Sequence, residues 1–234
     1  MIYQGNAITV VQRDDGIAML TFDAQDESVN TLSSKMIEEF EAALAALGEA
    51  ANVKGLVITS AKDAFIVGAD ITEFHGMFRR DEDFLVDMNT RVHGIFNTLE
   101  DLPFPSVAAI NGLALGGGCE ITLACDFRVM SDSAKLGLPE TKLGILPGWG
   151  GCVRLPRLIG ADNAIEWISG GTENRADAAL KVGAVDAVVS GDALEAAALD
   201  ILGRANAGEL DYQARRSVKQ SPLCLLYTSP SPRD

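Results

Sequence analysis

Two glutamates are the residues of this sequence best suited to acid–base chemistry. Glu120 follows the glycine run at residues 116–118, and Glu140 follows Leu138-Pro139. Both lie among apolar and glycine residues typical of a protein core, where burial moves the pKa of a carboxyl group toward neutrality. If the fold brings them together around a water molecule, one carboxylate can accept a proton while the other, protonated, donates one.

The glycine run predicts a loop that opens a helix. Residues 106–110 before it are apolar and β-branched, which predicts a buried strand, and residues 119–126 after it have helical composition. Glycine lets a backbone approach a ligand closely, and a helix N-terminus carries unpaired N–H groups that favour an ionised Glu120. We therefore expect the N–H of Gly117 to serve as an oxyanion donor, with a second donor in the loop at residues 68–70.

These features also have purely structural interpretations. The glycine run could be a tight loop where a helix and a strand pack closely, and each glutamate taken singly could cap or bridge structure. Cys119 could be a nucleophile near a helix N-terminus, but no histidine lies near it in the sequence, which favours a packed thiol. Asp70 is expected to fix its own loop, and Trp149 to form a wall of a pocket or of the core.

The hydrophobic pattern predicts an α/β protein. Residues 7–12 and 17–22 are typical of a β-hairpin with Asp-Gly in its turn. A helix with apolar residues at helical spacing follows from residue 33, and then a strand over residues 53–59, which indicates a crossover unit. Further helices are expected over residues 81–99, 152–159, 162–169, 175–181 and 192–207, the last with Asp192 as N-cap, and further strands over residues 127–130, 135–138 and 185–189.

Composition limits the possible partners. The chain has 234 residues, 47% of them hydrophobic, and its net charge of −14 disfavours nucleic acid and anionic membranes. Four cysteines without metal-type spacing favour a reducing compartment, and two histidines exclude a multi-histidine metal site. The first residues lack the features of a signal peptide, and no apolar run approaches the ~20 residues of a membrane span. We therefore expect a cytoplasmic protein.

Several common catalytic motifs are missing from the sequence. It contains no G-x-S-x-G, no G-x-x-x-x-G-K-[ST], no G-x-G-x-x-G and no H-E-x-x-H. Serine hydrolase, P-loop, nicotinamide-binding and zinc protease functions therefore lose their usual support.

Three ordered motifs resemble the enoyl-CoA hydratase/isomerase (crotonase) superfamily. They are FIVGADI at residues 65–71, AINGLALGGGCE at residues 109–120 and LPETKLGILPG at residues 138–148. Within the superfamily, residues 1–5, 65–74 and 99–103 are most similar to the amino-terminal parts of the α subunits of bacterial fatty-acid oxidation complexes. The resemblance covers roughly residues 1–222.

This resemblance implies a spiral of repeated β-β-α units, with mixed sheets flanked by helices. It implies an acyl-CoA thioester substrate whose carbonyl oxygen accepts hydrogen bonds from the N–H groups of Ala69 and Gly117. Glu120 and Glu140 would add water across a 2-trans-enoyl-CoA, and the same site would shift 3-enoyl to 2-enoyl double bonds. The remaining substrate-binding residues that it implies are Ile66, Gly68, Asp70 and Gly116.

The resemblance also divides the chain and suggests partners. Residues 1–190 would form the catalytic core, and residues 191–222 would begin a C-terminal helical region that is cut short. It implies no cofactor here, since NAD would serve only a dehydrogenase part that this fragment lacks, and it implies a thiolase subunit as partner. Residues 223–234 look like translated adaptor or vector sequence. A non-catalytic acyl-CoA-binding module and a relative that performs decarboxylation or thioester hydrolysis remain alternatives.

Overall fold

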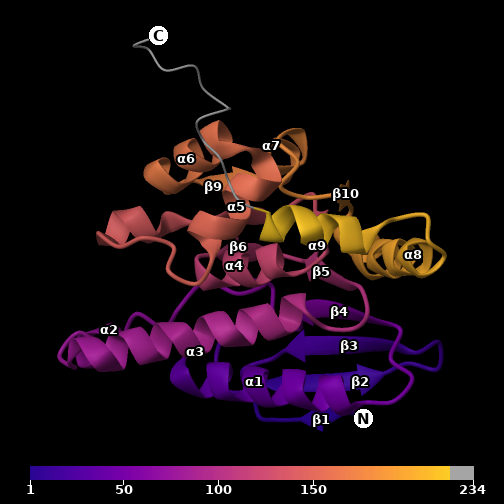
Figure 1. Cartoon of the computed structure of the whole chain (residues 1–234), viewed down its shortest axis with the longest axis horizontal. Coiled ribbons are helices and arrows are strands. Elements are labelled where there is room, and N and C mark those ends of the chain that lie inside the picture. Colours follow the sequence, from indigo (N-terminus) through magenta and orange to yellow (C-terminus); the bar gives the residue numbers. More distant parts are fainter. Residues whose placement is uncertain (222–234) are drawn as a thin grey trace.

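The larger sheet of the protein is mixed and has seven strands in this computed structural model, which describes residues 1–221 (Figure 1). The expected foreign tail at residues 223–234 lies outside the described residues. The strand order is β1-β2-β3-β4-β5-β7-β10; β1 to β3 pair antiparallel and the remaining neighbours pair parallel. The strands are β1 (Tyr3–Gln4), β2 (Ile8–Gln12), β3 (Ile17–Phe22), β4 (Gly55–Ser60), β5 (Ser106–Ile110), β7 (Phe127–Ser131) and β10 (Ala187–Val189).

A second, smaller sheet carries the segment that leads to the glycine run. It consists of β6 (Leu113–Leu115), β8 (Lys135–Gly137) and β9 (Glu173–Arg175), with β8 in the middle. The sequence predicted a direct step from β5 to the glycine loop, and this was wrong because β6 lies between them. Pairing with β8 and the hydrogen bond from Leu115 N to Ile66 O, 2.9 Å long, make this short segment a strand.

The helices agree with most of the predicted ranges. The side chains of Ser33 and Asp81 cap α1 and α3 by accepting hydrogen bonds from Met36 N and Phe84 N. The helices are α1 (Ser34–Glu49), α2 (Phe74–Met77), α3 (Glu82–Glu100), α4 (Gly117–Ala124), α5 (Gly151–Ile159), α6 (Ala161–Gly170), α7 (Ala176–Lys181), α8 (Leu194–Asn206) and α9 (Tyr212–Gln220), with 3-10 turns η1 (Pro139–Leu143) and η2 (Gly191–Ala193).

The prediction of Asp192 as the N-cap of α8 was wrong. Asp192 lies inside η2, and the N-cap is Ala193, which makes no side-chain capping bond. The hydrogen bond from Ala193 N to Ser190 O closes a 3-10 turn, so the α-helix starts one residue later than the sequence predicted.

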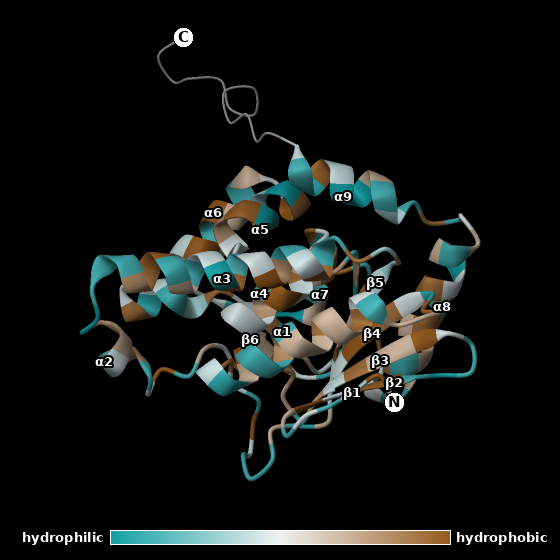
Figure 2. Cartoon of the chain, turned by 60° about the horizontal axis from the view of Figure 1, so that its bottom comes forward, coloured by the Kyte–Doolittle hydropathy of each residue, from teal (hydrophilic) through white to brown (hydrophobic). Residues whose placement is uncertain are grey.

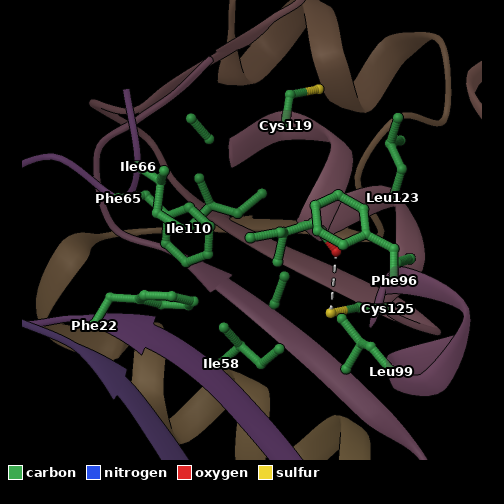
Figure 3. Close-up of a cluster of buried hydrophobic side chains, with 14 of the residues drawn as sticks. Phe22, Ile58, Phe65, Ile66, Phe96, Leu99, Ile110, Cys119, Leu123 and Cys125 are labelled. Atoms are coloured by element: carbon green, nitrogen blue, oxygen red, sulfur yellow. Dashed lines mark hydrogen bonds between the residues drawn. The ribbon is translucent and has the colours of Figure 1, made fainter. Parts of the chain in front are cut away.

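Both faces of the parallel strands are buried, which explains their unbroken apolar sequences. Along β5, Ala108 and Ile110 face a core that also contains Phe22 and Phe96 (Figure 3). The alternate residues of this strand face α8 on the opposite side of the sheet. Helix α8 therefore packs on the same sheet as the helices before it, while the division of the chain at residue 190 stays a prediction.

Helix α9 docks through charges. The hydrophobic pattern did not predict it, although the family resemblance implied a helical region over residues 191–222. The helix is mostly hydrophilic (Figure 2) and therefore lacks the apolar stripe by which helices are recognised. Its Arg216 is buried and donates to both carboxylate oxygens of Asp126, at 2.7 and 2.8 Å, and to the carbonyl oxygens of Leu102 and Phe104. The side chain of Asp126 is fully buried and also accepts a hydrogen bond from Ser106 N.

We expect Arg216→Met to destabilise the protein because it leaves the Asp126 carboxylate buried without its cation. The loss should be about 3 kcal/mol in the free energy of unfolding, measured by urea denaturation. The matched control is Arg204→Met on α8, whose ion pairs with Asp200 and Glu209 are exposed and should contribute below ~1 kcal/mol. Equal losses in both variants would show that the buried pair has no special weight.

Candidate active site

A cavity of about 270 Å³ brings together six of the eight residues expected to act on or bind the substrate. They come from three segments that lie far apart in the sequence: the loop before α2, the start of α4, and η1. The six are Gly68, Ala69, Gly116, Gly117, Glu120 and Glu140.

The loop before α2 contributes the backbone N–H of Ala69 to the site. Leu32 N donates to Gly68 O at 2.8 Å, and Asp70 N donates to Leu32 O at 3.3 Å, so the backbone is held on both sides of Ala69. Within residues 1–221, the Ala69 N–H itself donates to no acceptor. Gly68 adopts φ +105°, a conformation that favours glycine.

The start of α4 contributes a second N–H of this kind. Gly116 adopts φ +53° and donates to Gly137 O at 3.0 Å, which ties the glycine run to β8. Gly117 is the first residue of α4, so its N–H has no intrahelical acceptor, and no other acceptor occurs in the described part of the chain. Both N–H groups thus belong to residues that line the cavity.

The Glu120 side chain projects from α4 but is held by hydrogen bonds from the start of α5. Its carboxyl group is almost completely buried, and Oε1 accepts hydrogen bonds from Trp149 N at 2.8 Å and Gly151 N at 2.7 Å. These donors lie where α5 begins. Glu120 does lie in the first turn of its own helix α4, as the sequence predicted. The sequence did not predict the two donors at the N-terminus of α5, to which the carboxylate oxygen reaches across.

The pKa of Glu120 is raised to about 7, mainly because burial disfavours the charged form. The hydrogen bond from Gly151 N opposes this shift, the negative charge of Glu140 adds to it, and Trp149 N and the Arg154 guanidinium oppose it. These effects leave Glu120 able to exchange a proton near neutral pH.

Glu140 is buried with fewer partners. Its Oε2 atom is inaccessible and has no hydrogen-bond partner within residues 1–221, and burial raises the pKa of its carboxyl group. The backbone of Gly116 lies so close that an added Cβ would be 3.3 Å from Glu140 Oε1. A buried carboxyl oxygen without a partner is costly, and such groups are typical of functional sites.

The rest of the cavity wall is mainly apolar. Trp149 contributes to it, as the sequence indicated, and packs edge-on against Phe96 with ring centroids 6.3 Å apart. Its Nε1 donates to Asn89 Oδ1 at 3.2 Å. Asn89 and Met88 on α3 also line the cavity and were missed, because their helix was interpreted only as a core helix.

Two of the expected substrate-binding residues lie outside this cavity. Ile66 is fully buried among the core residues, and its N–H and carbonyl oxygen are bonded to Leu113 and Leu115 (Figure 3). Asp70 accepts hydrogen bonds from the N–H and hydroxyl of Thr72, so it does fix its own loop, and it borders a smaller neighbouring cavity.

Other chemistry finds little support in the described residues. Cys119 is a buried thiol in the core, as predicted, and burial raises its pKa well above the usual value (Figure 3). Within residues 1–221, no group of three or more His, Cys, Asp or Glu residues is arranged to hold a metal ion. Among the helices of the same residues, none combines the length and apolar character needed to cross a bilayer.

Comparison with known proteins gives consistent matches. The α subunits of the fatty acid oxidation complexes of Pseudomonas putida (strain GB-1) and Pseudomonas aeruginosa (strain LESB58) are each 58% identical over 225 residues. The match covers 96% of this chain and 32% of each relative, so the chain spans about a third of their length.

Solved structures show the same fold. An enoyl-CoA hydratase from Bacillus anthracis aligns with a TM-score of 0.78 and 36% identity, covering 92% of this chain and 81% of that one. DspI from Pseudomonas aeruginosa aligns with a TM-score of 0.77 and 30% identity, covering 92% and 85%. The family model described as enoyl-CoA hydratase/isomerase matches residues 12–220. With most of its length matched in sequence and in structure, this chain belongs to the enoyl-CoA hydratase/isomerase family and has the crotonase fold.

Proposed function

We propose that this chain hydrates 2-trans-enoyl-CoA to 3-hydroxyacyl-CoA in fatty-acid β-oxidation and also isomerises 3-enoyl-CoA to 2-enoyl-CoA. One observation carries the proposal: two buried carboxyl groups with raised pKa values line the same cavity as two residues whose amide N–H groups have no acceptor in the described chain. Family membership supports the substrate class, since a solved relative is named an enoyl-CoA hydratase.

The two N–H groups suit the thioester carbonyl oxygen. When water adds to C3, negative charge develops on that oxygen, and the N–H groups of Ala69 and Gly117 stabilise it. The mainly apolar wall, including Trp149 and Met88, suits the acyl chain.

The two carboxyl groups take different parts in the proton transfer. Glu120 has Oε1 occupied by two N–H donors, so its ionised form is supported and Oε2 can accept a proton from water. Water oxygen then bonds to C3, and the pair of carboxyl groups delivers a proton to C2. In isomerisation, Glu140 takes a proton from C2 and returns one to C4.

We further propose a setting for this reaction. The relatives are named as subunits of a fatty acid oxidation complex, which supports assembly in such a complex, with a thiolase subunit as the partner. The described cavity requires no cofactor for hydration, and NAD would serve only a dehydrogenase part. The reducing compartment indicated by the cysteines supports the cytoplasm.

We expect Glu120→Gln and Glu140→Gln each to lower kcat for hydration of crotonyl-CoA by about 10²–10⁴-fold, because an amide cannot exchange the proton. Loss of the conjugated enoyl thioester absorbance measures the rate. Binding of the thioester, measured by calorimetry, should persist in both variants.

The control for this experiment is Glu82→Gln, which changes an exposed carboxylate in the first turn of α3 and should leave the rate unchanged. Wild-type rates in both Gln variants of the site would refute the proposed reaction. Binding without turnover by the wild-type protein would favour the non-catalytic acyl-CoA-binding alternative.

A second prediction concerns stability against pH. The pKa of Glu120 rises from 4.5 to about 7 on folding, so the protonated form stabilises the folded state, fully below pH 4.5. This stabilisation is lost as pH rises through about 7. Between pH 4.5 and 8, the wild-type free energy of unfolding should therefore fall by about 3 kcal/mol relative to Glu120→Gln. Urea denaturation at each pH measures it, and a constant difference between the two proteins would contradict the shift.

A further inference from the structure

The turn that holds Glu120 is itself held from the other side by Arg154. This residue lies in the first turn of α5, is buried, and its Nη1 donates to Trp149 O at 3.4 Å. The guanidinium lies so close under Gly150 that an added Cβ there would be 2.1 Å from Nη1. Glu120 and Arg154 thus contact the same turn, residues 149–151. The carboxylate accepts hydrogen bonds from N–H groups of the turn, whereas the guanidinium contacts the Trp149 carbonyl oxygen and lies close to Gly150.

Arg154 is anchored to α3 rather than to solvent. Its Nε donates to Glu100 Oε2 at 3.0 Å, and its Nη2 donates to Asn97 Oδ1 at 2.8 Å. Glu100 is also buried, and its other oxygen pairs with Lys219 of α9 at 2.7 Å. A buried anion between two buried cations is costly unless its geometry is fixed, so the three side chains hold one another in place.

We propose that Arg154, oriented by Glu100, is a positioning residue of the active site, which fixes the turn at residues 149–151 and thereby the place and charge of the Glu120 carboxylate. Arg154 does not line the cavity and is not a catalytic residue. The inference rests on the proposed function only where it concerns rate; the coupling to Glu120 stands on the contacts themselves.

The charged groups that face Glu120 come from three elements. Arg154 on α5 favours its ionised form, and Glu140 on η1 disfavours it. The thiols of Cys119 on α4 and Cys152 on α5 remain uncharged near neutrality, because burial raises the pKa of each. The pKa of Glu120 should therefore change when Arg154 is removed, and also when Glu100, which pairs with Arg154, loses its charge.

The test is a direct titration of Glu120 by carbon NMR, with ¹³C-carboxyl glutamate incorporated into the whole chain. The Glu120 resonance is assigned by its absence from Glu120→Gln. Arg154→Met removes a cation, so the midpoint should move up by about half a pH unit or more. Glu100→Gln leaves Arg154 and Lys219 uncompensated, so the midpoint should move down.

Two further variants separate position from charge. Arg154→Lys keeps the charge but loses the planar fork, so the midpoint should stay within a few tenths of a unit while kcat for hydration falls about tenfold. Arg157→Met on the same helix is the matched control, because Arg157 donates, within the part of the chain that the structure describes, to the carbonyl oxygens of Val153 and Ser221 and not to the turn at residues 149–151. Neither its midpoint nor its rate should change.

Opposite shifts in Arg154→Met and Glu100→Gln support the inference, and unmoved midpoints or shifts in the same direction overturn it. If Arg154→Met fails to fold, the other two variants still test the inference. It is overturned if the Glu120 midpoint does not move down in Glu100→Gln and kcat is unchanged in Arg154→Lys. Failure of the proposed reaction is recognised separately, since Glu120→Gln would then hydrate at the wild-type rate whatever the titrations show.

Discussion

The burial of two carboxyl groups in one mainly apolar cavity is the constraint on which the rest of this structure depends. Removing a carboxylate from water is unfavourable, so the fold must either supply hydrogen-bond donors or let the group keep its proton. It does the first for Glu120, through Trp149 N and Gly151 N, and leaves Glu140 Oε2 without a donor in the described residues. Two chemically identical side chains therefore become different, which suits the proposed hydration, because one carboxylate accepts a proton from water while another proton is delivered to the substrate.

The sequence left two interpretations of the glycine run open, a tightly packed loop and an oxyanion donor, and the structure is compatible with both. An added Cβ on Gly118 would lie 2.3 Å from Ile66 O, and one on Gly117 would lie 2.7 Å from Leu32 Cδ1. Helix α4 therefore packs directly on the backbone of the loop, as the structural interpretation expected. The same close approach places the free N–H of Gly117 at the cavity that Ala69 lines, so tight packing is the means by which the two amides come to one place.

Some of this structure could be predicted because its signals are local. The Asp-Gly hairpin, the cap at Ser33 and the apolar strands follow from short-range rules, and all three are present. The support of Glu120 could not be predicted, because its donors lie about thirty residues away, at a turn whose position depends on tertiary packing. The hydrophobic pattern missed helix α9 for a related reason: the helix docks through ion pairs with Asp126 and Glu100, and its own sequence has no apolar period.

Two cations with buried side chains, Arg128 and Lys219, lie at the C-terminal end of α4. Arg128 Nη1 donates to Thr122 O and Cys125 O, and Lys219 Nζ donates to Ala124 O and Cys125 O. These bonds satisfy the last carbonyl groups of the helix and place positive charge at its negative end. At the other end, the N–H of Gly117 has no acceptor among residues 1–221, and Gly117 at the positive end of α4 lines the cavity. Cations from β7 and α9 thus stabilise the C-terminus of the helix whose N-terminus lines the cavity.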